Sequence, residues 1–382
     1  MYDNSEKCTP RYTSMKYLLT DFRQDVQQFY EFILFPDNGR EPNAMSTIKV
    51  GIIGCGNLGK THAKCIAELE GMEIRAYCDV FEQSAQAMLE QFGGAYATTD
   101  TDRFFNDPEL DAIYVTTQHD THTEYSIRAL EAGKHVLVEK PLAMTTEDCV
   151  RIGETVVRTG KKLFTAFKMR YYELLWKAKE LIPQPVVVTM QMMDNRWGNT
   201  TWANDPVKGG GNVLSQGCHS ADILRFVSGG EPVEVYAAGA NYYQPTGVVD
   251  NMVAVFRFDN GAAGSLVQGD AGCPPLTSKF FMQLFAENKS ITINDRLTKL
   301  TYTEAGKGTQ VFEGTESGFL EENKAFLRCL QDDTPAPIDH VDGLYATLMV
   351  LQAFESLRSG KPEPIKSVVE RAVASIPGKV QA

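Results

Sequence analysis

The sequence has no apolar run that approaches the ~18–20 residues of a membrane span, so we expect no membrane-spanning segment. It also has no run rich in lysine and arginine, and its formal net charge is −12. An acidic chain without a basic stretch argues against a nucleic-acid-binding protein. Internal repeats and low-complexity tracts are absent as well. The composition is that of an ordinary globular protein, with 43% hydrophobic and 23% charged residues.

The cysteines form no CxxC pair and no cysteine–histidine cluster at zinc spacing, so nothing in the sequence calls for a metal site. Scattered cysteines are typical of reduced thiols, and we therefore expect a cytoplasmic protein in which they fill small apolar spaces. The eight are Cys8, Cys55, Cys65, Cys78, Cys149, Cys218, Cys273 and Cys329.

Residues 1–45 stand apart as an N-terminal extension. They lack the basic start, apolar core and cleavage site of a secretory signal. Apolar residues at helical spacing predict an amphipathic helix from roughly Ser14 to Leu34, and Pro36 follows it. Three interpretations stay open: a docking or oligomerisation arm, a disordered lead, or a segment upstream of a start codon at Met45. The last two are together somewhat favoured over the first.

Residues 46–168 alternate between strand-like and helix-like patterns. A chain of 382 residues is long enough for two domains. The alternation predicts a first domain built on a doubly wound parallel sheet. The predicted strands are 48–53, 72–79, one near 95, 112–116, 135–139 and 163–166, and the predicted helices are 58–69, 81–92, 123–132 and 146–159.

Residues 169–382 no longer alternate regularly between strand-like and helix-like patterns. Their pattern predicts a second, α+β domain with a large, mostly antiparallel open sheet. Asp259-Asn260-Gly261 lies between two strand-like runs and is a hairpin signal. The predicted strands are 186–191, 233–238, 252–258, 262–268, 280–285 and 290–293; the predicted helices are 172–181, one in the GGG-led stretch 209–222, 318–331 and 340–359.

Gly54, Gly56 and Gly59 form a GxGxxG motif that follows a strand and opens a helix. In this context the first glycine permits a tight turn, the second lets the backbone approach a pyrophosphate, and the third allows close helix–sheet packing. The helix N-terminus supplies N–H donors for the phosphates. The second strand ends at Asp79, which would accept hydrogen bonds from ribose hydroxyls and repel a 2′-phosphate. We therefore expect NAD, with NADP less favoured.

The passage EAGKHVLVEKPL places Glu139-Lys140-Pro141 at the end of a strand. With the glycine motif, it resembles the Gfo/Idh/MocA family of NAD(P)-dependent oxidoreductases, which includes glucose–fructose oxidoreductase and inositol dehydrogenases. The resemblance runs from about Ser46 almost to the C-terminus. It implies a Rossmann domain over 46–168, a substrate-binding and oligomerisation domain over 169–382, and an active-site lysine at Lys140, commonly held by a cis bond to proline.

The resemblance also implies the cofactor contacts. His122 matches a frequent histidine in the loop after the fourth strand, whereas Gln118 and His119 stand where relatives more often have proline and asparagine. Arg170 matches the usual arginine at the entry to the second domain, and a crevice-wall role is as plausible for it and for His122 as a catalytic one. The predicted cofactor-binding residues are Gly54, Gly56, Asn57, Leu58, Gly59, Asp79, Thr117, His122, Glu139, Lys140 and Arg170.

Ser215, His219 and Asp222 share one helical face behind three glycines. The resembling family has an aspartate and a histidine there, spaced D-x-x-x-H, and the histidine commonly acts as acid/base. Here the aspartate position holds Ser215, which brings no charge. Lys140 and His219 are the predicted catalytic pair. Two roles stay open for Asp222: partial replacement of the missing carboxylate, or a structural role. The predicted substrate contacts are Lys140, Arg170, Ser215, His219 and Trp202.

The leading hypothesis is an NAD-dependent oxidoreductase that acts on a secondary hydroxyl, a CH–OH group, of a sugar, a cyclitol or a derivative. Two alternatives stay open: an enzyme that uses NAD transiently for elimination or glycoside cleavage, and a non-catalytic, nucleotide-sensing regulator, which Ser215 favours. The resemblance further implies a homo-oligomer, a dimer or tetramer, through the sheet of the second domain.

Overall fold

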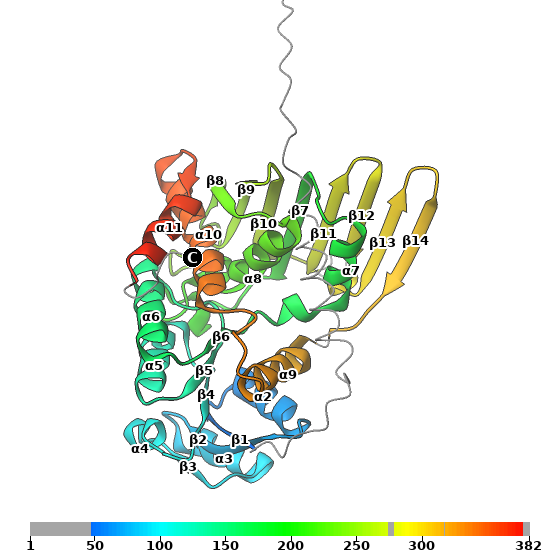
Figure 1. Ribbon diagram of the computed structural model, residues 1–382. Helices are drawn as coiled ribbons and strands as arrows, with labels where there is room; N and C mark the ends of the chain where they lie inside the picture. Colours follow the sequence, from blue (N-terminus) through cyan, green and yellow to red (C-terminus); the bar gives the residue numbers. More distant parts are fainter. Residues whose placement is uncertain (1–46, 274–278, 317, 377–382) are drawn as a thin grey trace, which may run out of the picture. The chain divides into compact units, whose positions relative to one another are not determined.

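The computed structural model describes residues 47–273, 279–316 and 318–376 (Figure 1). The amphipathic helix predicted over 14–34 lies outside these residues. Within them, no helix is long and apolar enough to cross a membrane, and no group of histidine, cysteine or acidic side chains has the arrangement of a metal site.

The first sheet is parallel throughout, in the strand order β3-β2-β1-β4-β5-β6, which confirms the doubly wound fold. The order reverses between β1 and β4, and the carboxyl ends of strands at such a point form a ligand crevice. The strands are β1 (Ile48–Ile53), β2 (Met72–Cys78), β3 (Tyr96–Thr98), β4 (Ala112–Val115), β5 (His135–Val138) and β6 (Leu163–Thr165). The helices are α2 (Asn57–Ala67), α3 (Glu82–Phe92), α4 (Thr101–Phe105), α5 (His122–Glu131) and α6 (Thr146–Thr159).

The second sheet has the order β14-β13-β12-β11-β7-β10-β9-β8-β15 and is antiparallel except for the β7–β10 pair. Three of its strands, β13, β14 and β15, were not predicted. The strands are β7 (Val187–Asn195), β8 (Pro232–Ala240), β9 (Asn251–Phe258), β10 (Ala263–Gly272), β11 (Phe280–Ala286), β12 (Lys289–Asn294), β13 (Lys299–Glu304), β14 (Gly308–Glu313) and β15 (Glu363–Pro364).

The helices that follow β6 are α7 (Glu173–Leu181), α8 (Gly211–Ser228), α9 (Gly318–Gln331), α10 (His340–Ser359) and α11 (Lys366–Ala374); the short 3-10 turns are η1 (His119–Thr121), η2 (Lys168–Tyr171), η3 (Trp202–Asn204) and η4 (Asp295–Leu297). Local signals explain where α10 starts and stops. Asp339 and Asp342 form a reciprocal capping box, and Gly360 ends the helix in the left-handed conformation at φ 68°.

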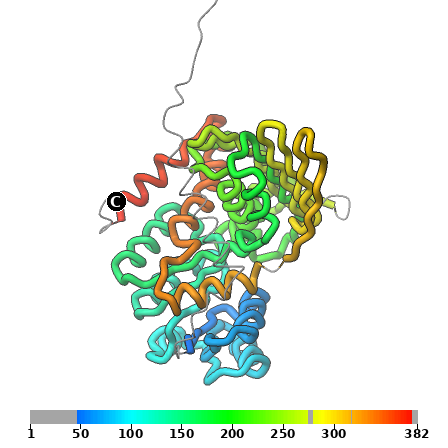
Figure 2. Tube along the Cα trace, turned by 45° about the vertical axis from the view of Figure 1, so that its right-hand side comes forward, coloured from blue at the N-terminus to red at the C-terminus, as the bar shows by residue number. Residues whose placement is uncertain are grey.

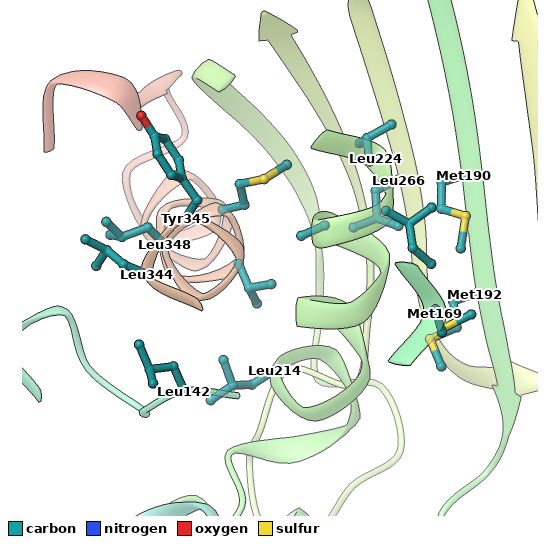
Figure 3. Close-up of a cluster of buried hydrophobic side chains, with 14 of the residues drawn as sticks. Leu142, Met169, Met190, Met192, Leu214, Leu224, Leu266, Leu344, Tyr345 and Leu348 are labelled. Carbon is teal, nitrogen blue, oxygen red and sulfur yellow. The ribbon is translucent and has the colours of Figure 1, made fainter. Parts of the chain in front are cut away.

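Helix α8 is buried along most of its length because it lies between the second sheet and α10. Figure 3 shows this core: Leu214 and Leu224 of α8 lie between Met190 and Leu266 of the sheet and the side chains of α10, among them Leu344. A helix buried on both sides has few ways to shift, because the close-packed interior resists small displacements. The polar residues of α8 are therefore held firmly in place.

Helix α9 returns from the second sheet to lie against α2 of the first domain, and both views show the two helices side by side (Figures 1 and 2). It also contacts η2, the turn that leads out of the first sheet. Side chains of α9 thus reach the carboxyl edge of the first sheet.

Candidate active site

One cavity of about 710 Å³ lies at the carboxyl ends of β1, β2, β4 and β5 and extends to the start of α8. It brings together most of the residues predicted to bind cofactor or substrate. Those that line it are Gly54, Gly56, Asn57, Leu58, Asp79, Thr117, His122, Glu139, Lys140, Trp202 and Ser215. Gly59, Arg170 and His219 do not line it, for reasons given below.

The three motif glycines have distinct environments. Gly54 has φ +93°, and a Cβ on it would lie 2.7 Å from the backbone of Thr116. A Cβ on Gly59 would lie 2.2 Å from the carbonyl oxygen of Gly54, so this residue serves helix–sheet packing rather than lining the cavity. A Cβ on Gly56 would meet nothing within 4 Å, so the backbone there is open to a ligand. No side chain caps the N-terminus of α2, and its free N–H groups are available for an anion.

Asp79 lies where β2 ends, beside the glycine loop. One carboxylate oxygen accepts a 2.7 Å hydrogen bond from the N–H of Cys55 inside the loop, and the other accepts from the N–H of Phe81 at 2.9 Å. The side chains of Val80 and Phe81 line the cavity and are 75% and 71% exposed. Two exposed apolar side chains next to a carboxylate form a surface suited to the adenosine half of a dinucleotide.

Lys140 enters the cavity from the end of β5, and its bond to Pro141 is cis, as the resemblance implied. The side chain of Lys140 donates from Nζ to the carbonyl oxygen of Ser215 on α8 at 3.2 Å. Its backbone N–H donates to Oε2 of Glu139 at 3.1 Å. The ammonium therefore lies at the boundary between the first domain and α8.

A buried chain of hydrogen bonds behind Glu139 was missed in the sequence. Nε2 of His62 lies 3.2 Å from Oε1 of Glu139, and Nδ1 of His62 lies 3.0 Å from Nδ2 of Asn323 on α9. Because an amide N–H donates, Nδ1 accepts and Nε2 carries the proton that it donates to Glu139. No local signal could reveal this contact, since His62 and Asn323 are 261 residues apart.

Glu322 lies next to Asn323 on α9 and is fully buried, and neither of its carboxylate oxygens has a hydrogen-bond partner in the described part of the chain. Burial, and then the charge of Glu139, raise its pKa well above the usual range. The neighbouring ammonium groups of Lys168 and Lys140 act in the opposite direction. Burial therefore favours the neutral form of the Glu322 carboxyl group.

Helix α8 presents Ser215 to the cavity, whereas His219, one turn further along, is 6% exposed and is not among the lining residues. Nδ1 of His219 has no hydrogen-bond partner among the residues that the structure describes, and the ring makes an edge contact with Phe167 at 5.9 Å. Burial, and then the charges of Lys140, Lys168 and Lys279, hold its pKa well below 6.5. The imidazole is therefore neutral at physiological pH.

Arg170 and Asp222 form a buried ion pair, with Nε of Arg170 2.9 Å from Asp222 Oδ2. Nη2 of the same guanidinium lies 3.0 Å from Asp342 on α10. The charge of Asp222 is thus directed at Arg170, so Asp222 does not supply His219 with the carboxylate that Ser215 lacks. Arg170 joins η2 to α8 and α10 instead of facing the cavity.

The loop after β4 forms another wall of the cavity. Thr117 accepts a hydrogen bond from Thr121 within the loop. The two ring nitrogens of His122 face carbonyl oxygens, that of Pro141 at 2.8 Å and that of Thr117 at 3.3 Å. His122 therefore connects this loop to the residue that follows Lys140.

Trp197 and Trp202 both line the cavity. The Trp202 ring packs edge-on against His119 with ring centroids 4.9 Å apart. Nε1 of Trp197 donates to Asp194 at 3.1 Å. Tyr242 and Tyr243, by contrast, are exposed and do not line the cavity.

Comparison with known proteins agrees with this geometry. Residues 48–167 match the model of an oxidoreductase family with an NAD-binding Rossmann fold, and residues 178–274 match the Gfo/Idh/MocA C-terminal domain. The chain is 28% identical over 341 residues to myo-inositol 2-dehydrogenase from Thermotoga maritima, with 84% of this chain and all of the relative covered. It is 34% identical over 129 residues to inositol 2-dehydrogenase from Salmonella typhimurium, which covers 33% of this chain and 38% of the relative.

Solved structures show the same fold. Levoglucosan dehydrogenase in complex with NADH and levoglucosan superposes with a TM-score of 0.77 at 21% identity, covering 83% of this chain and 99% of that one. The WlbA dehydrogenase from Bordetella pertussis, in complex with NADH and UDP-GlcNAcA, gives 0.76 at 22% identity, covering 85% and 99%. With both family domains matched in order over more than half of its length, the chain belongs to the Gfo/Idh/MocA family of oxidoreductases.

Proposed function

We propose that this protein is an NAD-dependent dehydrogenase that moves a hydride between nicotinamide and a secondary hydroxyl of a sugar, a cyclitol or a derivative. One observation carries the proposal: a single cavity joins the open glycine loop and Asp79 to Lys140 and Ser215. The relatives are named for inositol dehydrogenation, and two similar structures hold NADH with a carbohydrate-type ligand.

The proposed cofactor is NAD rather than NADP. The carboxylate of Asp79 borders the cavity next to Val80 and Phe81, and no lysine or arginine among the lining residues adjoins it on β2 or the following turn. A 2′-phosphate would meet this negative charge, whereas ribose hydroxyls would donate hydrogen bonds to it. Thermal-shift titration with NAD and with NADP tests the assignment: NAD should raise Tm more than NADP, and Asp79→Ala should narrow the difference. A larger shift with NADP would contradict it.

In the proposed reaction, bound NAD supplies the hydride acceptor. Lys140 holds the substrate hydroxyl and stabilises the negative charge that develops on its oxygen. His219, neutral because of burial and the nearby lysines, accepts the hydroxyl proton at an imidazole nitrogen. Ser215 lies on the cavity wall, and its hydroxyl would hold the substrate without adding charge.

The proposed role of Arg170 is to position α8. Its guanidinium joins Asp222, three residues after His219, to Asp342 on α10. A shift of this pair would move the catalytic histidine rather than a substrate contact. Glu139, held by His62, positions Lys140 from behind in the same way.

A second candidate function is a nucleotide-sensing regulator without turnover. Two observations favour it: Nδ1 of His219 has no partner in the described residues, and position 215 holds a serine. A third, transient oxidation by tightly held NAD that leads to elimination or glycoside cleavage, would consume a glycoside without net NADH. Measurement of NADH and of substrate loss in the same reaction separates the three.

We also propose a cytoplasmic homo-oligomer, a dimer or tetramer, that forms through the second sheet. The face of this sheet opposite α8 carries large apolar side chains that are about half exposed, and they are cross-strand neighbours. Tyr236 on β8 pairs with Val255 on β9, and Ala238 pairs with Val253. Adjacent exposed apolar side chains on a wide sheet are characteristic of an interaction surface.

A further inference from the structure

His119 occupies a position in the cavity that the proposed mechanism does not use. It is the first residue of η1, in the loop after β4, and it lines the same cavity as Lys140 and Ser215. Its side chain is 4% exposed. Trp202 packs edge-on against one side of the ring, and His122 lies 5.6 Å away on another.

One hydrogen bond determines which nitrogen of His119 carries the proton. Nδ1 lies 2.9 Å from the carbonyl oxygen of Gly209, and a carbonyl oxygen only accepts. Nδ1 therefore carries the hydrogen. Burial, followed by the influence of His122 and Lys140, keeps the pKa well below 6.5, so the ring is neutral. Nε2 is then an unprotonated acceptor, and it has no hydrogen-bond partner among the described residues.

The other two histidines near the cavity have other partners or another proposed role. Both ring nitrogens of His122 face carbonyl oxygens. His219 is not among the lining residues, and its proposed role is to accept the proton of the hydroxyl held by Lys140. His119 lines the cavity, and a substrate hydroxyl is a donor of the right kind for an unprotonated imidazole nitrogen.

We propose that Nε2 of His119 accepts a hydrogen bond from a second substrate hydroxyl, distinct from the one held by Lys140, and that Trp202 forms the apolar wall beside it. The inference rests on the proposed function, because it requires a polyhydroxylated substrate in this cavity. It makes His119 a specificity-determining residue, which selects substrates with at least two suitably spaced hydroxyl groups.

Three variants separate an acceptor role from a merely structural one. His119→Asn keeps a donor for Gly209 near the position of Nδ1 but has no acceptor where Nε2 was. His119→Gln reverses this, because its amide oxygen reaches the position of Nε2. His119→Phe removes both. His135→Asn, at the amino end of β5 and outside the cavity lining, is the matched control.

The experiment titrates the NADH-loaded full-length protein with myo-inositol, levoglucosan and L-sorbose and measures Kd. The proposal predicts a roughly threefold to tenfold rise in Kd for the Asn and Phe variants, the loss of about one hydrogen bond, with recovery in the Gln variant and no change in the control. NADH affinity should stay unchanged in all four, which shows that each variant is folded.

Two results would overturn the proposal, and they differ from each other. If wild type binds one of the three polyols and His119→Asn binds it equally well, or if the Asn and Gln variants are weakened alike, the acceptor role is wrong while the proposed function stands. If wild type with NADH binds none of them, the proposed polyol function fails, and this inference fails with it.

Discussion

Replacement of Ser215 by aspartate should restore the basicity of His219. Ser215 lines the cavity one helical turn before His219, and side chains four residues apart on a helix lie about 5–6 Å apart at Cβ. At an effective dielectric constant of about 20, a charge at about 5 Å is worth about 3 kcal/mol, or about two pKa units. A carboxylate favours the imidazolium form, so the pKa of His219 should rise.

The pKa can be read from the protein itself. The chain has six histidines, and NMR titration of their ring C–H signals, assigned with the His219→Gln variant, follows the pKa of His219 in wild type and in Ser215→Asp. Ser215→Asn, similar in size but uncharged, is the control and should leave the pKa low. The acidic limb of the pH dependence of kcat/KM should move upward together with the pKa. An unchanged or lower pKa in Ser215→Asp would refute the view that the missing carboxylate keeps His219 weakly basic.

Three further perturbations test other parts of the structure. Asp222→Asn removes one partner of a buried ion pair and should lower the free energy of unfolding in urea by about 3–5 kcal/mol, whereas Glu355→Gln, at an exposed pair, should change it far less. Equal losses would contradict the buried role of Asp222. Burial lowers the pKa of His135 to about 4, so between pH 7 and 5 the unfolded chain binds a proton at this residue and the folded chain does not, which lowers the free energy of unfolding. His135→Asn should therefore lose less stability over this pH range than wild type, and an identical loss would contradict this. Val255→Lys on the open sheet face should shift light scattering toward monomer, and unchanged scattering would argue against that interface.

Much of the first domain was predictable from the sequence, because its signals are local. The strand and helix periods, the glycine motif and the EKP passage each lie within a short window, and the predicted boundaries agree with β1 and α6 to the residue. The missed strands β13 and β14 lie at an edge of the second sheet. The side chains of β14 are almost all exposed, so burial imposes no clear alternation on its sequence.

The parts of the site that were not predicted depend on contacts between distant segments. Asn323 reaches His62 only because α9 returns to α2, and Arg170 meets Asp222 and Asp342 across three separate elements. No pattern in one stretch of sequence encodes such pairs. From the sequence, His119 stands out only as a departure from the family pattern. Its free acceptor nitrogen follows from the contact of Nδ1 with the carbonyl oxygen of Gly209, which is 90 residues away in the sequence.

The most direct test of the proposed function is NADH formation, followed by absorbance, when the protein is mixed with NAD and a panel of polyols and sugars that includes myo-inositol and levoglucosan. We expect turnover of at least one of them by wild type, with kcat reduced at least a hundredfold in Lys140→Ala while NAD still raises Tm. Turnover that is unchanged in Lys140→Ala, or NAD binding by wild type without turnover of any compound in the panel, would contradict it.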